Sequence, residues 1–188
     1  MAPIPGYNVR KAAQVVAYFA QRSGGTINVL KLIKLVYLAE RTFIGKYDFP
    51  MLWDRLVSMP QGPVPSDTLN FVNGEYGDNE DWDSLISDRE EHLVGLRNAQ
   101  ITEDDLDELS DAEIEVLGEV WGQFGRMDRF ALVKYTHDNC PEWEDPHGSS
   151  SPIPYQRILR YLGKPHASDT AHEIESLRNL DAAIARAQ

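Results

Sequence analysis

The chain has 188 residues, of which 42% are hydrophobic, and this is enough for one domain with a buried core. No apolar run approaches the ~18–20 residues of a membrane span, and residues 1–6 lack the basic cluster and apolar run of a signal peptide. The formal net charge of −12 disfavours contact with phosphate backbones, so direct nucleic-acid binding is not expected. Together these features predict a cytoplasmic protein that binds neither membranes nor nucleic acid.

The charge is unevenly distributed along the chain. Residues 1–55 contain eight Lys or Arg and three Asp or Glu, whereas residues 103–119 contain nine acidic residues and no basic one. Such a segment can attract a basic protein partner and raise the association rate. An equally good interpretation is an acidic face that only keeps the protein soluble.

The first helix is predicted at residues 8–22. Asn8 is a suitable N-cap, apolar residues follow at helical intervals, and Ser23-Gly24-Gly25 ends the pattern. The link to the next predicted helix is so short that the two helices should pack as an antiparallel hairpin.

The segment 26–44 is predicted to be the central helix, because nearly all of its side chains are apolar. Lys31, Lys34 and Arg41 share one wedge of roughly 80°. They can be solvated, can pair with acids of the C-terminal half or can face a partner, and pairing within the chain is the favoured interpretation. Glu40 lies opposite this wedge, inside the apolar arc. A carboxylate there is expected to form a buried ion pair or a helix-terminus contact, rather than to act in catalysis.

Two short extended segments are predicted to form a small sheet. Residues 54–59 and 92–97 have the length and partial alternation of strands, and the two could pair. Three prolines within residues 60–65 exclude a helix there and favour a strand that runs into a stiff turn. The acidic stretch 75–91 is expected to be an exposed loop with room for one helical turn.

Further helices are predicted from caps and periodicity in the remaining chain. Ser66 is expected to cap residues 67–72, Ser110 and Glu113 form a capping box before a helix that ends at Gly125, and Asp128 should cap residues 129–137. The other two predicted helices are 153–162 and 168–187. The predicted fold class is therefore mainly α: a compact multi-helix domain around a central buried helix (26–44), with a small two- or three-stranded β element.

The last predicted helix carries an apolar stripe: Ile174, Leu177, Leu180 and Ile184. Such a stripe either completes the core of the domain or docks a partner or a second copy of the chain.

Four blocks of sequence carry a family resemblance. The first two are Lys31-Leu-Ile-Lys-Leu-Val-Tyr-Leu-Ala-Glu40 and Gln61-Gly-Pro-Val-Pro65, and the third is Phe124-Gly-Arg-Met-Asp-Arg-Phe-Ala-Leu-Val133. The fourth block has three parts: Thr136-His137, Cys140-Pro-Glu-Trp143 and Gly148-Ser-Ser-Ser-Pro-Ile153. In order and spacing they resemble the Panacea domain of SocA-like antitoxins from toxin–antitoxin systems. Many members have Tyr-Gly-Pro-Val where this chain has Gln61, and an uninterrupted Pro-Trp where Glu142 intervenes here. These departures bear on the subfamily and so on the type of toxin.

The resemblance implies a mostly helical cytoplasmic protein that neutralises a cognate protein toxin, usually by direct binding, with a role in phage defence. At least one branch of the family instead acts as an adaptor that delivers the toxin to a AAA+ protease, which is the alternative function. The resemblance places the Panacea-like antitoxin domain at residues 1–165, with residues 166–188 as a C-terminal amphipathic helix packed on the same domain. A homodimer is possible, and no cofactor is implied.

The predicted partner-binding residues come from the Gly-Pro turn, the acidic segment and the last motif block. Gly62 and Pro63 can act simply by setting backbone shape, or can form a rigid loop that faces the partner. The predicted contacts are Gly62, Pro63, Val64, Glu103, Asp104, Asp107, Glu108 and Trp143.

Residues 137–147 contain two histidines, one cysteine and several acids, which allows two enzymatic hypotheses. One is a metal site, but the separation of His137 and His147 matches no usual ligand spacing. The other is Cys140 as a nucleophile activated by His137, but no oxyanion-hole pattern accompanies them. A metal- or cysteine-dependent hydrolase is thus the least favoured function, and no catalytic, cofactor or metal site is predicted. In the favoured interpretation His137 ends a helix and Trp143 folds back onto the core.

Overall fold

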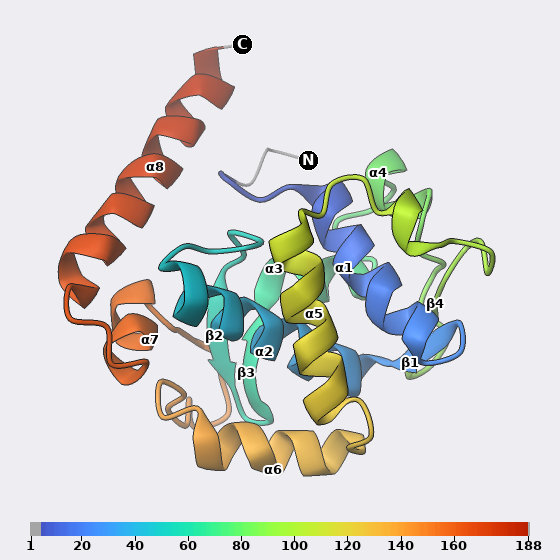
Figure 1. Ribbon diagram of the computed structural model, residues 1–188, viewed down its shortest axis with the longest axis horizontal. Coiled ribbons are helices and arrows are strands. Elements are labelled where there is room, and N and C mark those ends of the chain that lie inside the picture. The colour runs from blue at the N-terminus through green and yellow to red at the C-terminus, as the bar shows by residue number, and fades with distance from the viewer. Residues whose placement is uncertain (1–4, 188) are drawn as a thin grey trace.

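Helix α2, Val29–Tyr47, runs through the centre of the molecule, as the computed structural model shows for residues 5–187 (Figure 1). Helices α1 (Val9–Arg22), α5 (Asp111–Phe124) and α6 (Arg129–Asn139) pack against it. Its side chains are buried along most of its length, and the fold is mainly α around a central buried helix, as predicted. Residues 1–4 lie outside the described residues. They belong to the N-terminal segment for which the sequence predicted no signal peptide.

The central helix begins three residues later than predicted. Thr26–Asn28 forms strand β1, which pairs antiparallel with β4, Leu93–Gly95. The Asn28 side chain then caps α2 by accepting a hydrogen bond from the Lys31 backbone N–H at 3.3 Å. The periodicity of residues 26–28 fits a helix, but pairing with a strand distant in sequence satisfies their backbone groups instead.

The predicted pairing of residues 54–59 with 92–97 is wrong, because the two segments lie in different sheets. Strand β2 (Leu56–Met59) pairs antiparallel with β3 (Gly62–Pro65) on one side and with β5 (Ser151–Pro152) on the other. The β2–β3 hairpin closes a much shorter loop than a pairing with residues 92–97 would, so it costs less chain entropy. The prolines of β3 fit because β3 is an edge strand.

Helix α3, Ser66–Val72, is not capped by Ser66 as predicted. The cap comes from Asp54, whose carboxylate accepts hydrogen bonds from the backbone N–H groups of Asp67 at 2.7 Å and Thr68 at 2.8 Å. These are two of the N–H groups that the first turn of a helix leaves without intrahelical partners. A residue twelve or more positions away in sequence thus performs the capping, which no local pattern could reveal.

The other predicted caps are confirmed. Asn8 accepts from the Lys11 backbone N–H at 3.0 Å, Ser110 and Glu113 form the capping box of α5, and Asp128 caps α6. The stretch 75–91 contains the short helix α4 (Glu80–Asp83) and is partly packed, since its Trp82 is buried. The remaining elements are the 3-10 helix Glu103–Asp105, α7 (Tyr155–Tyr161) and α8 (Ala167–Ala187).

Helix α8 packs on α7 through its first half, and its end extends beyond the rest of the molecule (Figure 1). In between, Asp181 accepts a hydrogen bond from the Gly6 backbone N–H at 2.6 Å. Ile174 is 1% exposed, whereas Leu177, Leu180 and Ile184 are 45%, 57% and 51% exposed. The apolar stripe predicted from the sequence therefore joins the core only at its beginning. No helix within residues 5–187 combines the length and the apolar character needed to cross a membrane.

Candidate partner-binding groove

Several sequence blocks of the family resemblance meet at helix α2. Gly62 of β3 has φ +100°, and a Cβ atom added there would lie 2.8 Å from Thr136 Oγ1 and 3.1 Å from Lys34 Nζ. Only glycine tolerates both this backbone conformation and this close approach of three elements. The Gly-Pro block therefore locks the β2–β3 hairpin against α2 and α6.

Of the three α2 cations expected to pair with acids, Arg41 does so, whereas Lys31 and Lys34 donate to backbone carbonyl oxygens. Arg41 forms an ion pair with the fully buried Glu142 at 2.5 Å, and Tyr37 also donates to this carboxylate. Near the end of α2, Lys46 pairs with Glu119 at 2.5 Å. Lys31 donates to the Gly125 carbonyl at 2.6 Å. Glu142, which interrupts the Pro-Trp motif, is thus the counter-ion of Arg41.

Lys34 is fully buried, and its Nζ donates to the Pro63 carbonyl oxygen at 2.8 Å. Burial lowers the pKa of this lysine from 10.5 to about 7, because an ammonium group loses its hydration there. Within residues 5–187 no carboxylate forms an ion pair with it. The pairing predicted for Lys34 is therefore wrong, and the cation is held by a backbone carbonyl instead.

Glu40 is also fully buried, but it forms neither the predicted ion pair nor a helix-terminus contact. Its Oε2 accepts hydrogen bonds from the backbone N–H groups of Met51 at 3.1 Å and Leu52 at 2.9 Å. Its Oε1 has no hydrogen-bond partner among the described residues. Burial raises the pKa of Glu40 from 4.5 to about 8, with the nearby Asp54 adding to the rise, so the group holds its proton at neutral pH.

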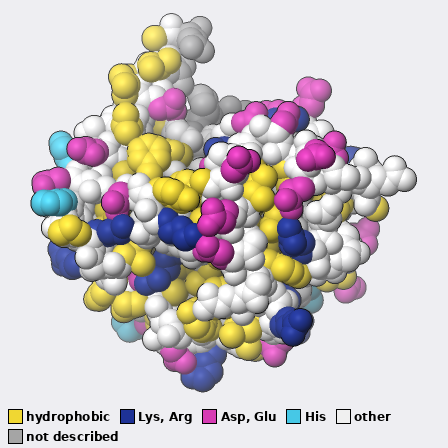
Figure 2. All heavy atoms as spheres, viewed as in Figure 1, with side chains coloured by type: hydrophobic (Ala, Val, Ile, Leu, Met, Phe, Trp, Pro, Cys, Tyr) yellow, Lys and Arg dark blue, Asp and Glu magenta, His cyan; other side chains and the backbone are white. Residues whose placement is uncertain are grey.

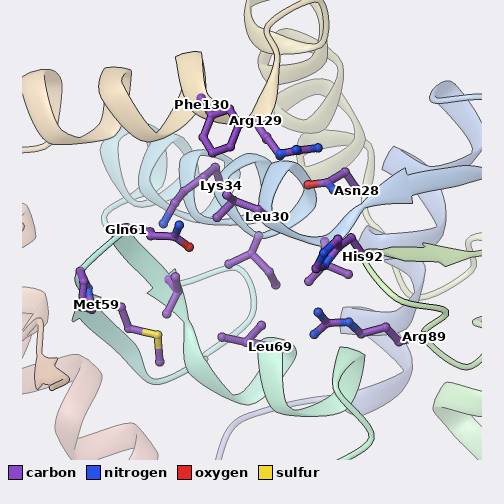
Figure 3. A pocket seen from close by; sticks show the side chains of 14 residues that line it. Asn28, Leu30, Lys34, Met59, Gln61, Leu69, Arg89, His92, Arg129 and Phe130 are labelled. Atoms are coloured by element: carbon purple, nitrogen blue, oxygen red, sulfur yellow. The ribbon is translucent and has the colours of Figure 1, made fainter. Parts of the chain in front are cut away.

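A groove of about 640 Å³ opens between α2, the β2–β3 hairpin, α3, the segment before β4 and the start of α6 (Figure 3). In this view Arg129 and Phe130 stand above the space, Leu69 lies below it, and Met59 and His92 lie on opposite sides. The walls are mainly apolar, and the polar side chains lie mostly at the entrance. The groove is lined by Asn28, Val29, Leu30, Ile33, Lys34, Met59, Pro60, Gln61, Val64, Leu69, Arg89, His92, Arg129 and Phe130.

The rim of the groove, which we define as Arg89, His92 and Arg129, is exposed and basic. Arg89 donates to the Glu91 carbonyl oxygen at 2.7 Å and to the Asn73 side chain, and both acceptors are neutral. The Arg129 guanidinium lies 4.8 Å from the centre of the Phe130 ring. None of the residues lining the groove is acidic, although the chain as a whole has a net charge of −12.

Of the predicted Gly-Pro turn contacts, only Val64 lines the groove, while Gly62 and Pro63 are buried behind it. Trp143 folds back as predicted: its ring stacks on His137 at 4.1 Å and its Nε1 donates to the Met59 carbonyl at 2.9 Å. These residues support the hairpin from behind. Their direct contact with a partner stays a prediction.

The acidic segment mostly faces helix α1. Glu103 pairs with Arg22 at 2.7 Å, Asp107 pairs with Arg10 at 3.1 Å, and Glu108 accepts from the Asn8 side chain at 2.9 Å. Figure 2 shows acidic and basic side chains interspersed on this face rather than one continuous acidic patch. Asp104 is exposed beside them. The role of these four acids as partner contacts stays a prediction.

The structure disfavours Cys140 as a nucleophile. The thiol is 1% exposed, and burial raises its pKa to about 12, so little thiolate exists at neutral pH. Burial and the nearby Lys34 lower the pKa of His137, whereas His147 lies at the surface. The described part of the chain contains no group of three or more His, Cys, Asp or Glu placed to hold a metal ion.

Sequence reasoning missed most of the groove, including Leu30, Leu69 and the rim. One signal was available at Phe130. The buried face of α6 is formed by Leu132 and Thr136, which are one turn apart, and Phe130 points about 200° away from Leu132 on a helix. A large apolar residue so far from the buried face is exposed, here to 61%, and marks a surface that can bind another molecule.

Taken together, these observations describe a helical protein with an apolar groove whose rim carries Arg89, His92 and Arg129. A family model described as antitoxin SocA-like, Panacea domain, matches residues 32–144, and the chain belongs to this family. The family resemblance read from the four sequence blocks is thereby confirmed. Comparison with curated proteins and with solved structures gives no match.

Proposed function

We propose that this protein is the antitoxin of a toxin–antitoxin system, and that it neutralises a cognate protein toxin in the cytoplasm by stoichiometric binding, without catalysis. The observation that carries the proposal is the family match over residues 32–144. The proposal assigns the antitoxin domain to residues 1–165 and treats segment 166–188 as a C-terminal addition, whose helix α8 packs on the domain through its first part.

The groove is the surface that best supports this function. Most of its lining residues lie inside the matched segment, and they stand on helices and on a hairpin locked by Gly62. A preformed apolar surface on rigid elements binds a partner with little loss of conformational entropy. Phe130, exposed at its edge, is the kind of aromatic residue that dominates binding energy at interfaces.

The test is co-expression with the toxin encoded beside the gene, followed by growth measurement and co-purification. The wild-type chain is expected to restore growth and to co-purify with the toxin in a fixed ratio. Phe130→Glu should abolish both effects, while Tyr161→Glu on α7, also an exposed aromatic, should retain them. Cys140→Ala and His147→Ala should retain rescue because neither supports catalysis.

Two outcomes would contradict the proposal. Rescue of growth without a detectable complex would exclude neutralisation by binding. Rescue that disappears in a host lacking its AAA+ proteases would instead identify the protein as a proteolytic adaptor.

A further inference from the structure

We infer that the groove binds a segment of the toxin in which an apolar side chain is accompanied by a carboxylate. This inference rests on the proposed function, and it names the chemistry that the groove recognises. The apolar side chain would lie against the walls, and the carboxylate would lie at Arg89 or Arg129.

The walls favour a side chain rather than a flat surface of the partner. Leu30 and Ile33 of α2 face the same space as Val64 of β3 and Leu69 of α3. The volume of about 640 Å³ falls within the range of about 300–1,000 Å³ typical of ligand pockets. It is therefore deep enough to remove one or two large apolar side chains from water, which is the main source of affinity at such a site.

The rim supplies the preference for an acid. Arg89 and Arg129 form no ion pair within residues 5–187, although the chain contains 30 acidic residues and only 18 Lys and Arg. Most Arg and Lys side chains elsewhere on α1, α2 and α7 have a carboxylate partner, as Arg10, Arg41 and Arg157 do. Two guanidinium groups left beside an apolar groove offer bidentate sites for a carboxylate.

The adjacent hollow extends the same charge pattern. It is lined by Lys31, Lys134 and Arg129, with Asp128 as its acidic residue. The Asp128 carboxylate is already occupied, because it accepts from the backbone N–H groups of Phe130 at 2.8 Å and Ala131 at 2.9 Å. Asp128 nevertheless keeps its charge, and Lys134 pairs with Asp138 at 2.7 Å, so Lys31 and Arg129 are the cations of this hollow that an acid of the toxin segment can reach.

Phosphate groups are also anionic, but the groove suits a protein segment better. Its walls are mainly aliphatic, and the two aromatic rings of the lining, Phe130 and His92, are both exposed at the edge, whereas binding a strand needs a row of aromatic faces for successive bases. The net charge of −12 also repels an extended phosphate backbone. The inference therefore commits to a peptide segment, and nucleic acid becomes an outcome of the test.

The first experiment maps the toxin segment by photo-crosslinking in the co-expressed complex. The photoreactive residue p-benzoylphenylalanine replaces Phe130 at the groove or, as a matched control, Tyr161 on α7. Both sites are exposed aromatics, so the exchange should leave the fold intact. We expect crosslinks to the toxin from position 130 and none from 161, and the crosslinked toxin peptide should contain Asp or Glu within about one helical turn of a large apolar residue.

The possible failures are distinguishable. A complex that crosslinks from position 161 but not from 130, or at a toxin peptide without an acid, would overturn the inference and leave the proposed function intact. A crosslink from position 130 to a second copy of this chain would assign the groove to self-association. If the unmodified chain forms no complex with the toxin, both the proposed function and this inference fail.

The second experiment reverses the charge of the rim. Arg89→Glu/Arg129→Glu is compared with Arg97→Glu/Arg160→Glu, which makes the same change in net charge at exposed arginines outside the groove. The rim variant is expected to weaken toxin binding by about tenfold or more, with a larger effect at low salt, and the control by less than about twofold. Equal effects of the two variants, with folding verified by circular dichroism, would show that the rim has no specific role.

A probe that does not depend on the toxin is 8-anilinonaphthalene-1-sulfonate, which joins apolar rings to one anionic group. Its fluorescence should rise on binding to the wild-type chain, and the rim variant should raise its Kd by about threefold or more relative to the control variant. No fluorescence rise, or equal Kd values, would overturn the inference. Displacement of the dye by a single-stranded oligonucleotide would reassign the groove to nucleic acid.

Discussion

Glu40 and Asp54 are fully buried carboxyl groups near one another, and the pKa values of both are raised, to about 8 and about 7. Burial is the main cause, because a carboxylate loses its hydration in the core. Asp54 is compensated by three hydrogen bonds, two from backbone N–H groups of α3 and one from the Thr68 hydroxyl. Glu40 receives only two, and both groups should contribute to the response of stability to pH, because both pKa values are raised by a similar amount.

Glu40→Gln is expected to change that response. The folded protein keeps a proton on Glu40 that the unfolded chain releases above its ordinary pKa of 4.5, so the stability of the wild type falls as pH rises from 4.5 through about 8. Glutamine does not titrate. Relative to the wild type, the variant should therefore gain at least about 2 kcal/mol in free energy of unfolding between pH 5 and pH 9.

Urea unfolding at several pH values measures this difference. The exposed Glu175→Gln on α8 is the control and should show no such trend. A pH-independent difference between Glu40→Gln and the wild type would mean that Glu40 is ionised in the folded protein.

Gly62→Ala tests whether the hairpin is locked by close approach as well as by backbone conformation. Gly24 is the matched control, since its φ is +90° but no atom lies within 4 Å of an added Cβ. Gly24→Ala should cost about 1–2 kcal/mol from backbone strain alone. Gly62→Ala should cost about 1–3 kcal/mol more, because Thr136 and Lys34 must move. Equal losses in thermal or urea unfolding would exclude a packing role for Gly62.

At the scale of elements, helix α8 has two halves with different roles. Ile174 is buried against the domain, and Arg178, just past the middle of α8, donates to the carbonyl oxygens of Trp53 and Asp54, so the helix is tied to the core up to its middle. The later part of the apolar stripe contributes little to packing within the chain. The core and docking interpretations of this stripe therefore apply to different residues of one helix.

Ile174→Ala and Ile184→Ala remove the same atoms from the two halves of α8. Ile174 is 1% exposed and Ile184 is 51% exposed. The first substitution should lower the free energy of unfolding by about 2–5 kcal/mol, because it leaves a cavity. The second should change it by less than about 0.5 kcal/mol. A comparable loss in both variants, measured by urea unfolding, would show that the end of α8 is also part of the folded core.

At the scale of the molecule, the basic N-terminal part and the acidic segment 103–119 attract each other within one chain. The pairs at Arg10, Lys11 and Arg22 join α1 to this segment. From the sequence, these acids were expected to be available to a basic partner. In the folded chain, several of them instead form ion pairs with basic side chains of α1. The groove differs from this face, because no acid is among the residues that line it.

Lys11→Met should lower stability because Lys11 Nζ lies 2.8 Å from Glu113 Oε1, and both side chains are largely shielded from water. The expected loss is about 1–2 kcal/mol, since a mostly buried carboxylate loses a charged partner. Lys134→Met removes an exposed ion pair with Asp138 within α6 and should cost less than about 0.5 kcal/mol. Equal losses in urea unfolding would mean that the pairing between α1 and the acidic segment adds nothing to stability.

The sequence alone was sufficient for the features that depend on neighbouring residues. The central helix, the caps at Asn8, Ser110 and Asp128, and the mainly α fold all follow from apolar spacing and from side chains that bond to backbone groups within a few positions. The family blocks belong to this category too, because they are read directly from residue order.

Only the tertiary structure decided the features that join distant parts of the chain. Strand β1 forms because Leu93–Gly95 is available to pair with it, α3 is capped by Asp54, and Lys34 is held by the Pro63 carbonyl. The groove likewise takes its walls and rim from several separate segments. Apolar periodicity and capping residues reflect interactions between residues that are close in the sequence. Which distant segments come to lie side by side depends instead on how the whole core packs around α2.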